Sequence, residues 1–161
     1  MNNVIPLPRL EIRHGLSDDR ESVTTLVEAV WREVYSGHLP PGAPDGPEHF
    51  TRLAGDPGDH GWVAKLGDQV VGYCRVEANC VDQIWVPRRM RRRSIGSALL
   101  ARALQSIRAR GFAFAQAGCE DFNQPARAFL EAKGWRVIGS QPQSLGAGRS
   151  CTALVFSLPL R

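Results

Sequence analysis

Residues 84–100 read IWVPRRMRRRSIGSALL and combine three local signals in succession. Ile84–Val86 ends an apolar, β-prone run, a turn with five arginines follows, and small residues then open a helix. A helix N-terminus offers unpaired backbone N–H groups and positive dipole charge, to which the arginines add full charges. Because Ser94, Gly96 and Ser97 are small, a bulky anion can approach the backbone closely. The stretch therefore predicts a strand, a phosphate-binding turn and a helix.

The chain before this stretch shows strand and helix patterns in turn. Asp18-Asp19-Arg20-Glu21 offers an N-cap, with a glutamate three residues on, for an amphipathic helix that ends near Tyr35. The Gly-, Pro- and Asp-rich segment 36–59 predicts a surface loop with one short helix at 48–53. Gly67-Asp68 indicates a hairpin turn. The strands predicted in this part are 10–13, 62–66, 69–77 and 80–86.

After the quoted stretch, helices and strands continue to alternate. Its helix ends at Gly111 and a strand at 112–119 follows, and two strands joined by such a helix are most simply parallel neighbours. Asn123 caps a shorter helix that ends at Gly134. The order predicts an α/β fold, a mixed central sheet of about seven strands with helices on both faces. The last two strands, on either side of a Gly/Ser/Pro-rich loop, are predicted at 135–139 and 151–158.

Length and composition indicate one globular domain over residues 1–161. The apolar fraction of 43% and the charged fraction of 22% are ordinary for such a domain. No apolar run approaches the ~20 residues of a membrane span, and the N-terminus does not have the pattern of a secretory signal. The four cysteines and four histidines show no ligand spacing, so we expect free thiols, no metal site, no membrane partner and a cytoplasmic location.

Charge is distributed unevenly along the chain. Residues 1–79 carry seven basic and twelve acidic side chains, whereas residues 80–161 carry thirteen basic and four acidic ones. The basic excess is centred on Arg88–Arg93, which predicts a small polyanion as ligand, while the acidic half mildly favours a cationic partner. Ordinary solvated charge accounts equally well for most of the acidic residues. A basic run also occurs in nucleic-acid-binding proteins, but no aromatic stacking pattern accompanies this one, so we expect no nucleic-acid partner.

Several motifs of the chain resemble those of one protein family. Arg91-x-x-Ser94-x-Gly96, after Val86, looks like the acyl-CoA motif of the GNAT superfamily of N-acetyltransferases, usually Gln/Arg-x-x-Gly-x-Gly/Ala. The block Asn123-x-x-Ala126-x-x-Phe129-Leu130-Glu131-x-x-Gly134-Trp135 resembles the Asn-x-x-Ala segment that follows in the family. The hairpin at 67–73 and the helix ending at 31–37 are similar to family segments as well. The resemblance runs from about Leu10 to Leu158 and implies a single-domain GNAT-like fold.

Two positions depart from the family pattern. Ser94 stands where the family prefers Gly, which costs energy if the backbone needs positive φ. Leu130 stands where many members carry the Tyr that protonates the leaving thiolate, and a leucine cannot act as an acid. These departures concern cofactor affinity and the proton donor, not the fold.

The resemblance implies acetyl-CoA as the cofactor and places its binding residues. Backbone N–H groups of residues 91–97 are expected to bind the pyrophosphate. The strand end at Trp85 and Val86 is expected to pair with the pantetheine arm and to polarise the thioester carbonyl. The Asn123 side chain is expected to touch the pantetheine. The full set of expected cofactor-binding residues is Trp85, Val86, Arg91, Arg92, Arg93, Ser94, Ile95, Gly96, Ser97 and Asn123.

Side chains of the strand that enters the quoted stretch alternate between two faces of the sheet. Ile84 and Val86 share one face, so we expect Val81, Gln83 and Trp85 on the other. The resemblance implies that this other face borders the acceptor. Gln83 is therefore a candidate substrate contact.

Direct acyl transfer needs a neutral amine and a group that takes its proton. Gln116, Gly118 and Glu120 share a face of the next strand, and Glu120 lies at its carboxyl end. Glu120 is therefore the candidate catalytic base, acting directly or through water, with a solvated loop carboxylate as the alternative reading. Asp121 is a weaker candidate for the base. Glu77 is an equal candidate if its side chain turns inward.

Trp31 and Tyr35, one helical turn apart, are candidates to line the acceptor pocket. Trp31 lies on the apolar stripe of its helix, which favours core packing, whereas Tyr35 lies at the helix end and fits either environment. Cys119 lies near the expected thioester, but nothing basic adjoins it to make a thiolate, so we interpret it as a structural thiol.

These observations together predict an N-acetyltransferase that moves the acetyl group of acetyl-CoA directly to a primary amine of a small cationic molecule or a peptide. Members of the family are often homodimers, so a second copy of the chain is a further expected partner. Two alternatives stay open. One is a non-catalytic acyl-CoA-binding module, which the leucine at position 130 favours, and the other is a nucleic-acid-binding protein that uses the arginine run.

Overall fold

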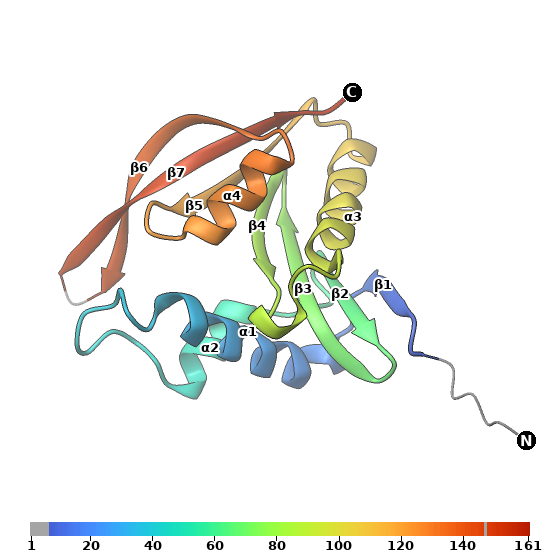
Figure 1. The fold of residues 1–161 in the computed structure, drawn as a ribbon, viewed down its shortest axis with the longest axis horizontal. Helices are drawn as coiled ribbons and strands as arrows, with labels where there is room; N and C mark the ends of the chain where they lie inside the picture. Colours follow the sequence, from blue (N-terminus) through green and yellow to red (C-terminus); the bar gives the residue numbers. More distant parts are fainter. Residues whose placement is uncertain (1–6, 147) are drawn as a thin grey trace, which may run out of the picture.

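Seven strands form one mixed sheet that runs through the molecule (Figure 1). A computed structural model describes residues 7–146 and 148–161 of the chain. The strand order is β1-β2-β3-β4-β5-β7-β6, and all neighbours are antiparallel except β4 and β5. The predicted fold class, strand number and parallel pair are confirmed. The elements are β1 (Leu10–His14), α1 (Arg20–Tyr35), α2 (Pro47–Ala54), β2 (Gly61–Leu66), β3 (Gln69–Glu77), β4 (Cys80–Trp85), α3 (Ile95–Ala109), β5 (Phe114–Glu120), α4 (Gln124–Ala132), β6 (Arg136–Gly146) and β7 (Arg149–Pro159), with short 3-10 turns at Ser17–Asp19 and Arg88–Met90.

Helices cover both faces of the sheet, as Figure 1 shows. On one face α1 and α2 pack over a core that includes Phe50 from α2, Tyr73 from β3 and Trp85 from β4. On the other face α3 contributes Leu99 and α4 contributes Leu130 to a second core. Each face of the sheet therefore has its own apolar core, and burial of these large side chains is the main source of stability.

The parallel strands β4 and β5 diverge soon after they pair. Their last paired residues are Val81 and Ala117. β4 continues to Trp85 and β5 to Glu120, but no further pair forms between them in the described ranges. The edge of β4 beyond Val81 therefore has backbone groups that β5 does not use, and they are available to another extended group.

A β-bulge at Asp82 determines which face each β4 side chain takes. Arg75 of β3 pairs with Gln83, and the next residue of β3, Val76, pairs with Val81. Asp82 therefore has no partner on β3 and is the extra residue. Val81 consequently joins the core on the α3 side, whereas Trp85 packs on the α1 side. The prediction that Val81 shares a face with Gln83 and Trp85 is wrong, because simple alternation does not allow for the extra residue.

The strands β6 and β7 form a long hairpin at one edge of the sheet (Figure 1). The sequence predicted that this strand ends at Gly139 and that a loop follows, whereas β6 extends to Gly146 and pairs with β7 along its length. β6 is an edge strand with a solvent-exposed outer side, so a sheet can tolerate Pro142 and many polar side chains there. A composition typical of a loop thus occurs in a strand, and this strand brings Gln143 next to Glu120.

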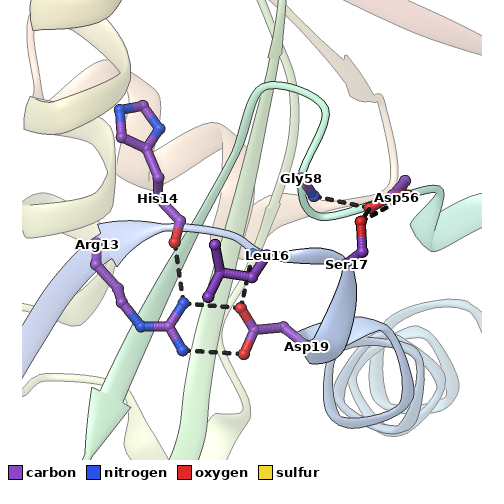
Figure 2. A network of polar contacts seen from close by, with 7 residues as sticks. All are labelled: Arg13, His14, Leu16, Ser17, Asp19, Asp56 and Gly58. Atoms are coloured by element: carbon purple, nitrogen blue, oxygen red, sulfur yellow. Dashed lines mark hydrogen bonds and ion pairs between the residues drawn. The ribbon is translucent and has the colours of Figure 1, made fainter.

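Polar contacts fix the start of α1, as Figure 2 shows. The Asp19 carboxylate accepts hydrogen bonds from the Arg13 guanidinium at 2.7 and 3.0 Å and from the Leu16 N–H at 2.8 Å. Asp56, which follows α2, accepts a bond from the Ser17 hydroxyl at 3.2 Å. The predicted N-cap is therefore corrected. Asp19 does precede α1, but its carboxylate binds β1 and the preceding turn instead of the helix N–H groups.

The four cysteines, Cys74, Cys80, Cys119 and Cys151, are free thiols, and two of them are buried. Within residues 7–146 and 148–161 there is no group of three or more potential metal ligands. None of the described helices has the length and apolar character needed to cross a membrane.

Candidate functional site

Two cavities lie where β4 and β5 diverge. The first, about 510 Å³, is bounded mainly by the turn before α3 and by the starts of α3 and α4. The second, about 850 Å³, lies on the α1 and α2 side of the sheet and reaches the β6–β7 hairpin. The cavities meet between the two strands, because both are lined by Tyr35, Asp82, Gln83, Trp85, Ala117, Gly118 and Glu120.

The start of α3 presents free backbone N–H groups to the first cavity. The Ala98 N–H donates to the Ser94 carbonyl at 3.0 Å, which is the first backbone bond of this helix. The N–H groups of Ile95, Gly96 and Ser97 come before it, so the helix supplies no acceptor for them. All three residues line the cavity. This end of the cavity therefore favours an anion, which the helix dipole also attracts.

Two residues of the basic turn, Arg92 and Ser94, have left-handed backbone conformations. Their φ angles are 61° and 62°. Ser94 precedes α3 directly, but its hydroxyl makes no capping bond to the helix. A conformation that glycine adopts without steric penalty is thus held here by a serine, at a cost of about 1 kcal/mol.

Gly96 keeps the first cavity open beside two apolar side chains. A Cβ at this position would lie 3.5 Å from two ring atoms of Phe129 and 3.8 Å from Cγ2 of Val86. These are ordinary contact distances, so a single methyl group fits. A branched side chain would add atoms that either collide with these neighbours or fill the cavity.

The arginines of the turn differ in their surroundings. Arg91 is half-buried, lines the first cavity and donates from Nε to the Val86 carbonyl at 3.4 Å. Arg92 is exposed and lines the same cavity, whereas Arg93 is exposed and lines neither cavity. Of the ten residues expected to bind the cofactor, Arg93 is the one that the structure does not bring to the first cavity.

Asn123 begins α4 at the wall of the first cavity. Its Oδ1 accepts the N–H of Ala126 at 3.3 Å, so the predicted N-cap is confirmed. Because the cap occupies this oxygen, the amide Nδ2 is the part of the side chain that remains for a ligand.

Glu120 lies at the end of β5, where the two cavities meet. Its Oε1 accepts a hydrogen bond from the Tyr35 hydroxyl at 2.7 Å and another from Gln143 Nε2 at 3.0 Å. Its Oε2 accepts none from the described residues. One oxygen is therefore fixed by α1 and β6, and the other remains available to a molecule in either cavity. This arrangement differs from that of a solvated loop carboxylate.

Tyr35 and Cys119, beside Glu120, both keep their protons at neutral pH. Burial, and then the Glu120 carboxylate, raise the pKa of the Tyr35 hydroxyl far above its ordinary value. Burial raises the pKa of the Cys119 thiol to about 11, and its Sγ lies 3.4 Å from the carbonyl oxygen of Glu120. Neither group is therefore a ready proton donor in place of the tyrosine that is absent at Leu130.

All three predicted acceptor contacts, Trp31, Tyr35 and Gln83, border the second cavity, and the alternative carboxylates do not. Trp31 is buried in the α1-side core, 5.7 Å from the Tyr35 ring between centroids, and its edge also lines the second cavity. Gln83 lines both cavities and donates from Nε2 to the backbone of α2 at 2.6 Å. Glu77 and Asp121 are exposed and line neither cavity.

Sequence reasoning missed several polar residues of the second cavity, among them His49, Arg75, Asp82 and Gln143. Alternation along residues 69–77 does place Arg75 on the face of Tyr73, so a signal for Arg75 was present. Asp82 reaches the cavities through a bulge and Gln143 through an extended edge strand, and neither feature has a clear sequence signal.

The family and the fold of the chain can be compared with those of known proteins. Residues 24–135 match the family model described as the acetyltransferase (GNAT) family. Comparison with curated proteins gives no match. Among solved structures, a GCN5-related N-acetyltransferase from Rhodopseudomonas palustris is 18% identical with a TM-score of 0.74, over 99% of this chain and 100% of that one.

Two further structural neighbours hold a cofactor. The PaiA N-acetyltransferase of Thermoplasma acidophilum, in complex with coenzyme A, is 15% identical with a TM-score of 0.72, over 94% of this chain and 99% of that one. The yncA protein of Salmonella typhimurium, with its cofactor acetyl-CoA, is 18% identical with a TM-score of 0.72, over 95% of each chain. These neighbours share the fold. Since the family model covers more than half of the sequence, the chain belongs to the acetyltransferase (GNAT) family, a family of acyltransferases.

Proposed function

We propose that this protein transfers the acetyl group of acetyl-CoA directly to a primary amine of a small cationic molecule or a peptide. The observation that carries the proposal is the position of Glu120. This carboxylate lies where the two cavities meet, with Oε1 fixed and Oε2 free. Such a group can take the proton of an amine in the second cavity while that amine attacks an acyl group held in the first.

The residues of the first cavity fit acetyl-CoA. The free N–H groups of Ile95, Gly96 and Ser97 suit a pyrophosphate, and Arg91 and Arg92 add positive charge beside them. Bound acetyl-CoA would supply the thioester whose acetyl group is transferred.

The unpaired edge of β4 supports the assignment of the pantetheine arm. Beyond Val81 this strand has no β5 partner in the described ranges, so the backbone at Trp85 and Val86 can bond an extended amide chain. The same backbone donors would polarise the thioester carbonyl. Asn123 Nδ2 is placed to contact the arm from α4.

No side chain of the site is a ready acid, which favours solvent as the source of the proton for the leaving coenzyme A thiolate. Leu130 lines the first cavity and has no acidic group, while Tyr35 and Cys119 hold their protons too tightly to give them up readily. Glu120 as base, held by Tyr35 and Gln143, is therefore the residue on which the chemistry of the chain depends. The reaction then proceeds without a covalent enzyme intermediate.

The acceptor is assigned to the second cavity because the residues of the first fit the cofactor. Asp82 and Glu120 both line it and would attract an ammonium group before it loses its proton. Trp31, Tyr35 and Gln83 are the proposed neighbours of the acceptor. The free thiols suit a reducing compartment, which supports the cytoplasm as the location.

The second candidate function, a non-catalytic acyl-CoA-binding module, is favoured by one observation, the leucine at position 130 on the wall of the first cavity. A panel of primary amines offered with acetyl-CoA, with release of free thiol as the readout, separates the two. Amine-dependent thiol release supports the transferase. Binding of acetyl-CoA by calorimetry without thiol release from any amine would identify the binding module.

A further inference from the structure

One wall of the second cavity carries basic side chains that the proposed transfer does not use. His49 and Arg52 lie on α2 and Arg75 lies on β3, and all three line this cavity. We call these three residues the basic cluster. Asp82 and Glu120 line the same cavity, which therefore has charges of both signs on its walls.

Arg75 has hydrogen-bonding capacity that the protein leaves unused. Its side chain is half-buried, and its Nε is fully buried without a partner. The four ion pairs found in residues 7–146 and 148–161 use other arginines. A buried donor without an acceptor costs about 1–3 kcal/mol, and more when it is charged. Protein atoms cover the Nε, so a ligand in the cavity can bind only the terminal nitrogens Nη1 and Nη2, which make no hydrogen bond in the described part of the chain.

The backbone beside Arg75 leaves room for its guanidinium. Gly55 ends α2 with φ of 66° and ψ of −158°, a conformation that glycine alone adopts readily. A Cβ at Gly55 would overlap Nη1 of Arg75. Gly55 thus leaves room for the guanidinium, and no hydrogen bond within the described residues occupies its terminal nitrogens.

The two other members of the basic cluster add donors to the same wall. His49 Nε2 is buried without a partner, and its ring is held edge-on against Trp31 with centroids 5.6 Å apart. Arg52, one helical turn later, is exposed at the rim of the cavity. The guanidinium groups of Arg52 and Arg75 thus line the cavity from two elements, and a planar guanidinium suits a carboxylate.

We propose that the acceptor carries a carboxylate in addition to its amine, with the carboxylate at Arg75 and the amine at Glu120. This inference rests on the proposed acetyl transfer and narrows the acceptor to an amino acid or a short peptide. Arg75 is on β3 and Glu120 on β5, with β4 between them. Two strand spacings amount to about 10 Å where strands are paired, and β4 and β5 diverge before Glu120, so the separation here exceeds that value. The amine and the carboxylate are therefore separated by several bonds, as in a dipeptide or an ω-amino acid.

Matched substrate pairs test this proposal. A series of ω-amino acids and dipeptides is compared with the corresponding carboxamides, with kcat/KM from thiol release as the readout. We expect each acid to exceed its amide by at least 10-fold, on the order of one charge-assisted bond. Equal values for acids and amides would overturn the proposal. Aminoalkyl phosphonates of equal length form a third arm, and a phosphonate that is better than the carboxylate would also overturn it.

The variant Arg75→Met tests whether Arg75 causes the preference for the acid over the amide. The ratio of acid to amide should fall to about one, and this ratio is insensitive to any general loss of activity because both substrates share that loss. Since Arg75 makes no hydrogen bond within the described residues, methionine of similar length should keep the fold, which thermal unfolding checks. Arg108→Met, on the exposed face of α3 and away from both cavities, is the matched control and should leave the ratio unchanged. An unchanged ratio in Arg75→Met would contradict the assignment.

Failure of the proposed function is recognised separately. If no amine of any kind is acetylated, the transferase proposal fails. Calorimetry with the carboxylated amines then tests whether Arg75 binds a carboxylate. Binding that is lost in Arg75→Met but kept in Arg108→Met supports the carboxylate site. Absence of binding to the wild type, or equal binding to Arg75→Met, rejects it.

Discussion

The Tyr35 hydroxyl donates a 2.7 Å hydrogen bond to Oε1 of Glu120, a residue 85 positions away in the chain. The bond joins the last residue of α1 to the last residue of β5, and both residues line both cavities. Because burial keeps Tyr35 protonated, it is a permanent donor to this carboxylate. The helix on the second-cavity side thus orients the proposed base of the reaction.

Tyr35→Phe should lower kcat about 10-fold. The variant removes one of the two bonds that hold Oε1, so the carboxylate of Glu120 can turn away from the amine, and one bond to a charged group contributes about 1.5–3 kcal/mol. Steady-state kinetics of thiol release measure the effect. Tyr73→Phe is the matched control, because the Tyr73 hydroxyl donates to the Ala54 carbonyl at 3.2 Å and its residue lines neither cavity. Equal losses in the two variants would argue against a positioning role for Tyr35.

Glu120→Gln should lower kcat/KM by about 100-fold, the usual contribution of a positioned general base. Glutamine keeps the shape of the side chain and can still accept the bond from Tyr35, but it cannot take a proton. The limb of the pH–rate profile that reports the base should therefore disappear. Glu77→Gln, at the exposed end of β3, should have wild-type kinetics. An unchanged rate and pH profile in Glu120→Gln would mean that this residue has no proton-transfer role.

Gly96→Val should abolish acetyl-CoA binding in a folded protein, whereas Gly96→Ala should weaken it only slightly. A methyl group lies at ordinary contact distance from Phe129, but the branches of valine project into the first cavity or against this ring. Isothermal titration calorimetry measures the affinity. Gly139→Val, which meets nothing within 4 Å on the edge strand, controls for the substitution itself. Unchanged affinity in Gly96→Val would show that the cofactor does not bind at this helix start.

Ser94→Gly should raise the free energy of unfolding by about 0.5–1 kcal/mol. Glycine adopts the φ of 62° without strain, and the entropy it adds to the unfolded chain offsets only part of the gain. The serine hydroxyl makes no capping bond that would be lost. Denaturant unfolding gives the value. Ser97→Gly, inside the first turn of α3, should change stability in the opposite direction, because glycine weakens a helix.

The ion pair of Arg13 and Asp19 (Figure 2) predicts how stability depends on pH. The bond from Arg13, followed by the Leu16 N–H, holds the pKa of the Asp19 carboxyl below its usual value. In the unfolded chain this carboxyl has its ordinary pKa near 3.9, so the unfolded state binds the proton first as the pH falls. The stabilisation is therefore complete above about pH 5 and is lost through pH 4 and below.

Denaturant unfolding of the wild type and of Asp19→Asn between pH 7 and pH 3 tests this dependence. The wild type should be more stable at pH 7, and the difference between the two proteins should shrink as the pH falls. A difference that stays constant over this range would show that the Asp19 charge does not contribute.

Much of the fold is predictable from residue patterns because long amphipathic segments dominate it. The stripe of Ile95, Leu99, Ala103 and Ile107 is a buried helix face in the structure, and the hairpin at Gly67 is present. The cofactor side of the site is local in sequence, so nine of its ten expected residues reach one cavity.

The second cavity is harder to predict, because its walls come from distant segments and depend on single-residue details. Gln143 lies in a stretch whose composition indicates a loop, yet an exposed edge strand tolerates the same residues. Asp82 and Val81 change faces through a bulge, which no hydrophobic period reveals. The hydrogen bond from Gln143 to Glu120 could therefore not be predicted from the sequence, although Glu120 itself could be named from its place at a strand end.

The bulge at Asp82 has a consequence for how this chain can diverge. One added residue in β4 decides that Val81 belongs to the α3 core while Trp85 belongs to the α1 core. The number of residues in this strand is therefore constrained independently of their identities. A point substitution along β4 would alter one side chain in its place, whereas a one-residue deletion there would move every side chain on one side of the deletion to the opposite face of the sheet.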